Sequence, residues 1–469
     1  MHALIALALS AALTATPTPT PTAPPGQREQ PPAPGKPADI RIPQRRELSL
    51  PNGLQVTLAP YGNMPKVDVE LVVATGNVHE GPTETWLADL TAQMLPEGST
   101  QHSAEQLAQQ AAKMGGAIEQ SVSPDETSVG GTVLSEYAPD LVRLVAEVVR
   151  HPAFPEQDFQ RVRADALRNL SIAKSQPQTL SQERFLAVTY PNHPYGRMLP
   201  PEAQLQGYSV QQVKDFYAKN FGARRSHLYV VGRFDERAVE AALREAFGDW
   251  EAGPAPEHHV PKPTVKRAVH VIDRPGSVQS ALRVGLPVVD PSNPDYIKLM
   301  VTNTLLGGSF GSRITRNIRE AKGYTYSPYS QLSSRYRDTF WTEVADVTTN
   351  VTGPSLKEIF GEVNRLQAQP PSQAELDAIK NYVVGTFVLQ NSARGGILSR
   401  LRFMDLHELP DSYLEDYVKN VMAVTPEDVQ QMARKYLKDE NMVVVITGDK
   451  KAIEKQVKPF GPVIVNPGK

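Results

Sequence analysis

The folded part of the chain begins near Ile40 with alternating apolar and polar positions. The segment RELSLPNGLQVTLAP, which starts at Arg46, alternates on both sides of a Pro-Asn-Gly turn and predicts two short antiparallel strands. The segment VDVELVVATG follows and predicts a third strand. The chain therefore opens its folded part with a strand hairpin.

An internal repeat divides the folded part into two similar halves. SVQQVKDFYAKNFGARRSHLYVVG, from Ser209 to Gly232, aligns without gaps on TPEDVQQMARKYLKDENMVVVITG, from Thr425 to Gly448. Each copy predicts a Ser or Thr helix cap, an amphipathic helix and an apolar strand that ends at glycine. Two halves of about 200 residues each follow from this repeat.

The mixture of hairpin strands and helices, without a regular βαβ alternation, predicts an α+β fold. We expect two similar sandwich domains, with mostly antiparallel sheets and helices packed on them. The Pro-rich stretch AGPAPEHHVPKP at 252–263 breaks the chain near its middle. The predicted domains are therefore 40–251 and 268–469, joined by a linker at 252–267.

The N-terminus predicts export. An apolar run from Ala3 to Ala12 resembles the core of a secretory signal, although it lacks a basic n-region, and it is too short to span a bilayer. We assign 1–15 to the signal and 16–39, rich in Pro and Thr, to a disordered tether. Together they predict a periplasmic protein without a transmembrane anchor.

Composition excludes several kinds of chemistry. The 49 Lys and Arg residues nearly balance the 51 Asp and Glu residues, so no overall field favours nucleic acid. Cysteine is absent, which excludes disulfides, thiolate nucleophiles and Cys-type zinc sites. His258 and His259 are adjacent in the Pro-rich linker, where solvated side chains are expected more than metal ligands.

The segment ATGNVHEGPTETWLADLTAQMLPEGS, which begins at Ala74, resembles peptidase family M16, the insulinase-like peptidases. In that family the segment contains a helix with a His-x-x-Glu-His motif, followed by Met-Leu and Gly-Thr or Gly-Ser. Counting forward from Glu80 and backward from Met94 places the motif at the same positions of this sequence. The positions of the motif fall on Asp89, Ala92 and Gln93.

These substitutions predict that the chain binds no zinc of its own. The motif uses two imidazoles to bind zinc and a Glu to take a proton from the bound water. Asp89 could bind a metal, but Gln93 is a poor zinc ligand and Ala92 cannot accept a proton. The resemblance places the third ligand, a Glu in the family, on Asn169. An ordinary amphipathic helix is the alternative interpretation of this segment.

The segment VTNTLLGGSFGSRITRNIREAKGYTYSPYS, which begins at Val301, resembles the second-half signature of the same family. It carries the family's Arg/Tyr pair onto Arg319 and Tyr326. In the family this pair reaches across a closed chamber toward the peptide substrate. Tyr324, which would share a strand face with Tyr326, is the alternative member of the pair.

A chain with this pair and without zinc ligands resembles the non-catalytic subunit of heteromeric M16 zinc metallopeptidases. The resemblance implies two M16/LuxS-like sandwich domains, a partner subunit with an intact His-x-x-Glu-His motif, and zinc in that partner. Residues 115–134 match the strand along which peptide substrates add in the family. A plain hairpin is an equal alternative for this segment.

Two other functions remain open at this stage. The chain could be a purely structural M16-like scaffold subunit, although a scaffold has no need of Arg319 and Tyr326. The run from Gly307 to Gly311 also fits the G-x-S-x-G motif of serine hydrolases, with Ser309 as nucleophile. That motif needs a preceding strand, whereas the apolar spacing before it predicts a helix, and His407 is the only downstream histidine.

Overall fold

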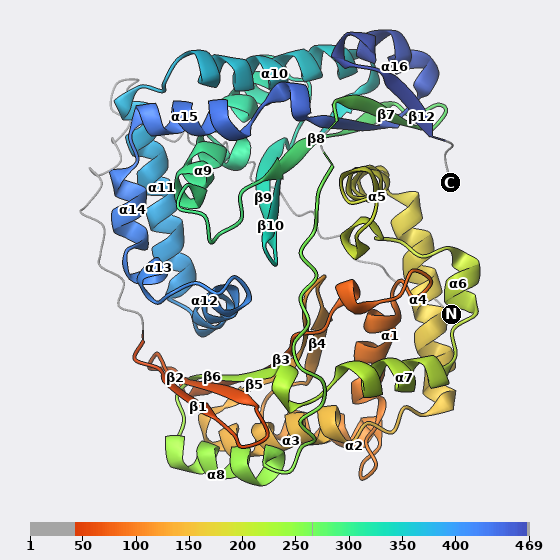
Figure 1. The fold of residues 1–469 in the computed structure, drawn as a ribbon, viewed down its shortest axis with the longest axis vertical. Helices are drawn as coiled ribbons and strands as arrows, with labels where there is room; N and C mark the ends of the chain where they lie inside the picture. The colour runs from red at the N-terminus through yellow and green to blue at the C-terminus, as the bar shows by residue number, and fades with distance from the viewer. Residues whose placement is uncertain (1–42, 265, 467–469) are drawn as a thin grey trace, which may run out of the picture. The chain divides into compact units, whose positions relative to one another are not determined.

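The computed structural model describes residues 43–264 and 266–466, so the predicted signal (1–15) and tether (16–39) lie outside the described residues. The first domain contains a six-stranded sheet with the order β1-β2-β6-β3-β5-β4 (Figure 1). Only the β2/β6 pair is parallel, and the predicted N-terminal hairpin is the antiparallel pair of β1 and β2. The strands are β1 (Arg46–Ser49), β2 (Gln55–Pro60), β3 (Lys66–Val73), β4 (Glu119–Val122), β5 (Thr127–Leu134) and β6 (Ser226–Gly232).

The second domain contains another six-stranded sheet, with the order β12-β7-β11-β8-β10-β9. β7 pairs in parallel with both β11 and β12, and the other pairs are antiparallel. The strands are β7 (Ala268–Asp273), β8 (Gln279–Val288), β9 (Tyr329–Arg335), β10 (Asp338–Thr348), β11 (Val443–Gly448) and β12 (Val463–Asn466). The α+β class with two similar, mostly antiparallel domains is confirmed.

The sequence repeat corresponds to a repeated structural unit. Helix α7 (Val210–Asn220) is capped by Ser209 and leads into β6, and α15 (Pro426–Tyr436) is capped by Thr425 and leads into β11. Each strand lies between one parallel and one antiparallel neighbour. The two copies therefore occupy the same position in their sheets.

Helices surround a separate hydrophobic core in each domain. In Figure 1, α10 and α15 run along the same side of the second sheet. The further helices of the first half are α1 (Leu87–Met94), α2 (Ala104–Lys113), α3 (Ala138–Arg150), α4 (Glu156–Ser175), α5 (Pro177–Thr189), α6 (Glu202–Gln206) and α8 (Glu236–Phe247). Those of the second half are α9 (Tyr296–Asn303), α10 (Thr352–Ala368), α11 (Gln373–Asn391), α12 (Arg394–Leu406), α13 (Ser412–Glu415), α14 (Tyr417–Ala423) and α16 (Lys450–Val457).

Two helices pack on the sheet of the opposite half. α5 lies against β8 and β11 of the second sheet, where the rings of Phe185 and Phe340 are 5.4 Å apart. α12 lies against β6 and β3 of the first sheet and buries Ile397, Leu398 and Leu401 there. This exchange joins the described residues into one compact unit.

Several hydrogen bonds attach the Pro-rich stretch between the domains to the first domain, including one from Arg225 Nε to Ala255 O at 2.8 Å. The Nε2 atoms of His79 and His193 lie 3.2 Å and 3.0 Å from the backbone oxygens of Glu257 and His259. The exposed ring of His258 stacks on Tyr336 at 4.1 Å. Within the described residues, no helix is both long and apolar enough to cross a membrane.

Candidate functional site

Helix α1 carries the positions at which the M16 motif would place its metal ligands and base. Asp89 borders a cavity of about 290 Å³, Gln93 is half-buried, and the methyl group of Ala92 is buried. Asn169 lies on α4, which packs against α1, but its side chain is exposed and does not line this cavity. Of the four positions, Asp89 alone lines this cavity.

The carboxyl of Asp89 is already engaged by a neighbouring amide. Asn77 Nδ2 donates to Asp89 Oδ2 at 2.7 Å and to Glu80 Oε1 at 3.1 Å. Burial raises the pKa of Asp89, and it raises the pKa of Glu80 to about 8. Both carboxyls therefore resist the charged form that a metal ligand requires.

The donor set around α1 does not fit a zinc ion. It offers one carboxyl, one carboxamide and one methyl group in place of two imidazoles and a carboxylate. Across residues 43–264 and 266–466, no group of three or more His, Asp or Glu side chains could hold a metal ion. We therefore derive no hydrolytic step for this chain, and zinc in a partner chain stays a prediction.

The β9–β10 turn of the second half closes one wall of the Asp89 cavity. Arg335, at the end of β9, lines the cavity and is buried between aromatic rings, 4.5 Å from the centroid of Tyr195 and 5.6 Å from that of Tyr190. The hydroxyl of Tyr195 donates to Asp125, and that of Tyr190 donates to Asp338 at 2.5 Å. These contacts join the β9–β10 turn to the first domain beside α1.

Arg319 and Tyr326 lie together on the surface of the second domain. The guanidinium of Arg319 lies 5.1 Å from the ring centroid of Tyr326 and 4.3 Å from that of Phe310. Tyr326 is 80% exposed and Phe310 is 70% exposed, which is unusual for large aromatic side chains. Two cation–π contacts thus hold one arginine between two solvent-facing rings.

The backbone between Arg319 and Tyr326 explains how they meet. Arg319 belongs to a wide π-helical segment, Thr315–Ala321, and the chain turns at Gly323, which has a φ of 65°. Tyr324 then packs against the second hydrophobic core, and Thr325 Oγ1 donates to Asp346 O at 2.6 Å. The expectation that Tyr324 and Tyr326 share a strand face is wrong, because this segment leaves a helix and is not a regular strand.

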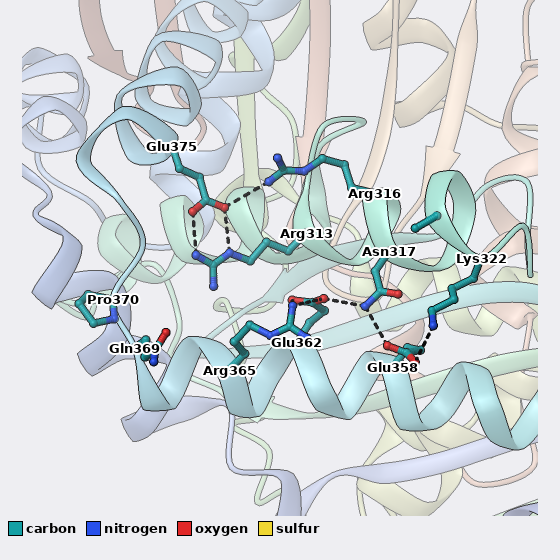
Figure 2. Close-up of a pocket in the computed structure, with 11 residues that line it drawn as sticks. Arg313, Arg316, Asn317, Lys322, Glu358, Glu362, Arg365, Gln369, Pro370 and Glu375 are labelled. Carbon is teal, nitrogen blue, oxygen red and sulfur yellow. Dashed lines mark hydrogen bonds and ion pairs between the residues drawn. The ribbon is translucent and has the colours of Figure 1, made fainter.

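The rest of the π-helical segment is fixed by an ion-pair network around a polar cavity of about 610 Å³ (Figure 2). Arg313 donates two hydrogen bonds to Glu375, at 2.8 and 2.7 Å, which lower the pKa of this carboxyl. Asn317 donates to Glu358 and Glu362 on α10, and Arg316 also contacts Glu375 (Figure 2). These contacts anchor the segment and leave Arg319 directed away from the network, toward Phe310 and Tyr326.

The segment 115–134 contains a hairpin of β4 and β5, and β4 is the edge strand of the first sheet. A cavity of about 240 Å³ runs beside it and is lined by Glu119, Gln120 and Ser121. An edge strand offers backbone groups to which an extended peptide can add. The position of this segment is therefore compatible with a peptide-binding strand and with a plain hairpin.

Ser309 does not have the geometry of a hydrolase nucleophile. Helix α9 and a π-helical turn, Thr304–Gly308, precede it in place of the required strand. Ser309 Oγ donates to Thr304 O at 3.0 Å. The helix predicted before Ser309 is confirmed.

Sequence reasoning missed Phe310 and Arg335. Phe310 follows Gly-Gly-Ser in a loop, and an aromatic residue among small ones was the only available signal. No local pattern marks Arg335, because its contact with the ring of Tyr195 joins residues 140 positions apart in the chain.

Comparisons with known proteins agree with this architecture. Residues 56–200 match the family model Insulinase (Peptidase family M16), and residues 208–383 match the model Peptidase M16 inactive domain. The chain therefore belongs to peptidase family M16.

Individual relatives extend the similarity over almost their whole length. The chain is 24% identical over 404 residues to the uncharacterized zinc protease YmxG of Bacillus subtilis, covering 84% of this chain and 96% of that protein. It is 25% identical over 443 residues to an uncharacterized zinc protease of Mycobacterium tuberculosis, covering 91% and 98% of the two chains.

Solved structures support the same fold. The crystal structure of a peptidase M16 inactive domain from Pseudomonas fluorescens has a TM-score of 0.80 and 26% identity, with 86% of this chain and 98% of that chain covered. A protease from Helicobacter pylori has a TM-score of 0.79 with 20% identity, covers 87% and 100% of the two chains, and supports the fold alone.

Proposed function

We propose that this chain is the non-catalytic subunit of a two-chain M16 zinc metallopeptidase. The partner chain carries an intact His-x-x-Glu-His motif and the zinc ion. This chain completes the chamber and presents Arg319 and Tyr326 to the peptide. The apolar run at the N-terminus, Ala3 to Ala12, supports a periplasmic location for the pair.

The chemistry of α1 supports the non-catalytic part of the proposal. Ala92 occupies the position of the general base, and a methyl group can neither accept nor release a proton. Gln93 occupies the position of the second imidazole. Peptide hydrolysis by this chain would need both groups, so the active site belongs to another polypeptide.

The observation that carries the proposal is the exposed stack of Phe310, Arg319 and Tyr326. Arg319 Nε lies 3.3 Å from Glu320 Oε1. The remaining N–H groups of the guanidinium and the hydroxyl of Tyr326 are donors that suit a carbonyl oxygen that gains negative charge. Because the rings of Phe310 and Tyr326 are exposed, they do not contribute to the hydrophobic core of this chain. A surface of this kind fits a contact with a peptide or with a second chain.

The proposal is tested by reconstituting the pair with an M16 partner that has the intact motif and following cleavage of a fluorogenic peptide. Arg319→Ala is expected to lower kcat/KM about 100-fold, as for the loss of one transition-state donor. Size-exclusion chromatography checks that the pair still assembles. Lys357→Ala is the control, because it removes an exposed cation from α10, which packs against the π-helical segment.

Tyr326→Phe distinguishes the contact of the ring with Arg319 from hydrogen bonding to the peptide, because it keeps the ring and removes the hydroxyl. A scaffold role predicts unchanged cleavage for Arg319→Ala and Tyr326→Phe. Stoichiometric tight zinc in the isolated chain, together with chelator-sensitive peptide turnover, would also contradict the proposal.

A further inference from the structure

A second cavity, of about 310 Å³, lies between helices of the second domain and has a lining rich in aromatic residues. Its walls come from α9, α11, α12, α13 and α14. Tyr382, which is 52% exposed, lies at its rim. The aromatic residues of the lining are Tyr296, Tyr382, Phe387, Phe403, Tyr413 and Tyr417.

Arg400 is the only charged residue in the lining of this cavity. Its guanidinium lies 5.2 Å from the ring centroid of Phe387, and Nη2 donates to Gln390 Oε1 at 3.0 Å. In the described part of the chain, no carboxylate forms an ion pair with Arg400. Two other arginines of α12 differ in this respect: Arg394 lies 3.5 Å from an oxygen of Asp68, and Arg402 binds two carboxylates of the first domain.

The hydroxyl of Tyr413 adds a second donor. Tyr296 Oη bonds with Ser334 at 2.9 Å and Tyr417 Oη contacts Met300 Sδ at 3.7 Å, whereas Tyr413 Oη has no hydrogen-bond partner among residues 43–264 and 266–466. Burial raises the pKa of Tyr413, so its hydroxyl keeps its proton at neutral pH. The cavity thus combines a positive charge and a neutral donor with apolar walls.

We propose that this cavity binds the C-terminal residue of a peptide when that residue is aromatic or large and apolar. The terminal carboxylate pairs with the guanidinium of Arg400, which matches a carboxylate through two parallel N–H donors. The side chain packs among the rings of the lining. The volume lies at the lower end of the range for ligand pockets and suits one residue, not a long segment.

The peptide assignment rests on the proposed function and on the position of the cavity in the chain. Gly308 belongs to the lining and lies two residues before Phe310, whose ring stacks on Arg319. A free amino acid fits less well, because its ammonium group would meet no carboxylate in this lining. The ligand is therefore a carboxylate whose nitrogen is in an amide bond.

Isothermal titration calorimetry with the full chain alone tests the proposal without zinc or a partner. The probes are N-acetyl-Ala-Ala-Phe, the same peptide as its C-terminal amide, and free phenylalanine. We expect the acid to bind at least 10-fold more tightly than the amide and than free phenylalanine. This comparison uses the unmodified protein, so it does not depend on the folding of any variant.

Variants then locate the site. Arg400→Gln is expected to weaken binding of the acid at least 10-fold, and Thr386→Trp, which fills the cavity from α11, is expected to prevent it. Arg168→Gln is the control, because this arginine is 66% exposed on α4 of the first domain. Circular dichroism checks the fold of each variant.

Equal affinity for acid and amide, or unchanged binding by Arg400→Gln, would overturn the proposal. Binding of 3-phenylpropionate more than 10-fold tighter than the peptide acid would assign the cavity to a small carboxylate and overturn the peptide assignment. Either failure leaves the Arg319 experiment unaffected, since that experiment measures cleavage by the reconstituted pair.

Discussion

At the scale of single residues, the carboxyl of Glu80 replaces a helix cap at the start of α1. The residue before α1, Trp86, has a φ of 72° and makes no side-chain cap. Glu80 Oε1 accepts instead from the backbone N–H of Ala88 at 3.0 Å, although it lies outside the helix. Burial is the main cause that raises the pKa of Glu80 to about 8.

This pKa predicts a pH dependence of stability. Between the ordinary pKa of 4.5 and the folded value of about 8, the native state holds a proton that the unfolded state releases. The contribution of Glu80 to stability is therefore full below about pH 4.5 and is lost as pH rises toward 8. From pH 5.5 to 7.5, the free energy of unfolding of Glu80→Gln should fall by about 2.5 kcal/mol less than that of the wild type.

Urea unfolding at the two pH values measures this difference. Glu119→Gln, which removes an exposed carboxyl from β4, is the control for the change in net charge. An identical pH dependence in Glu80→Gln and the wild type would show that Glu80 is ionised in the folded protein.

At the scale of elements, the two copies of the repeat have equivalent capped helices. Ser209 Oγ accepts from Gln212 N at 3.5 Å, and Thr425 Oγ1 accepts from Asp428 N at 3.1 Å. In both copies the side chain at the third helical position bonds back to the cap. This reciprocal pattern is local, which is why the sequence alone predicted both helix starts.

The caps should contribute similar amounts to stability. Ser209→Ala and Thr425→Ala are each expected to lower the free energy of unfolding by about 1 kcal/mol, because one N–H of the first turn loses its acceptor. Substitution by glycine should cost only about a few tenths of that amount in either copy. Chemical denaturation measures both, and equal losses for alanine and glycine would contradict a capping role.

The segment after Gly323 illustrates where element prediction failed. Its residues Tyr-Thr-Tyr have strand-like character, yet they follow the end of a helix, and Tyr324 packs against the core whereas Tyr326 is exposed. Strand propensity depends on the neighbouring surface more than on the residues themselves. The pairing of Arg319 with Tyr326 followed from the motif spacing, whereas the contact with Phe310 could not be read from it.

At the scale of the whole molecule, α12 holds the two domains together through charge as well as apolar packing. Arg402 donates to Glu70 Oε1 at 2.7 Å and to Glu126 Oε2 at 3.0 Å, and both carboxylates belong to the first domain. Burial raises the pKa of Glu126, and the charge of Arg402 opposes this effect. The arginine therefore compensates two carboxylates that water reaches poorly.

Arg402→Gln should destabilise the protein strongly. Removing one partner leaves buried charge uncompensated, and we expect a loss of about 3 kcal/mol in the free energy of unfolding. Arg400→Gln is the matched control on the same helix, with an expected loss of no more than about 1 kcal/mol from its contact with Phe387. Similar losses for the two variants in urea denaturation would contradict the role assigned to Arg402.

Residue identity and local spacing were sufficient to predict the family, the α+β class and the internal repeat. The assignment of the motif positions to Asp89, Ala92 and Gln93 rests on the same local spacing and stays a prediction. These properties depend on residue identity and on spacing along a short segment. The hydrophobic periodicity and the motifs are therefore enough to predict these properties.

The three-dimensional fold was needed to show which helix covers which sheet and how Arg335 closes the Asp89 cavity. It also shows that, within residues 43–264 and 266–466, Arg400 has no carboxylate partner while Arg402 has two. These properties depend on contacts between distant parts of the chain, such as Arg402 and Glu70, which are 332 positions apart. A side chain on α12 meets the first domain or an aromatic cavity according to the face on which it lies, and the fold alone determines what each face contacts.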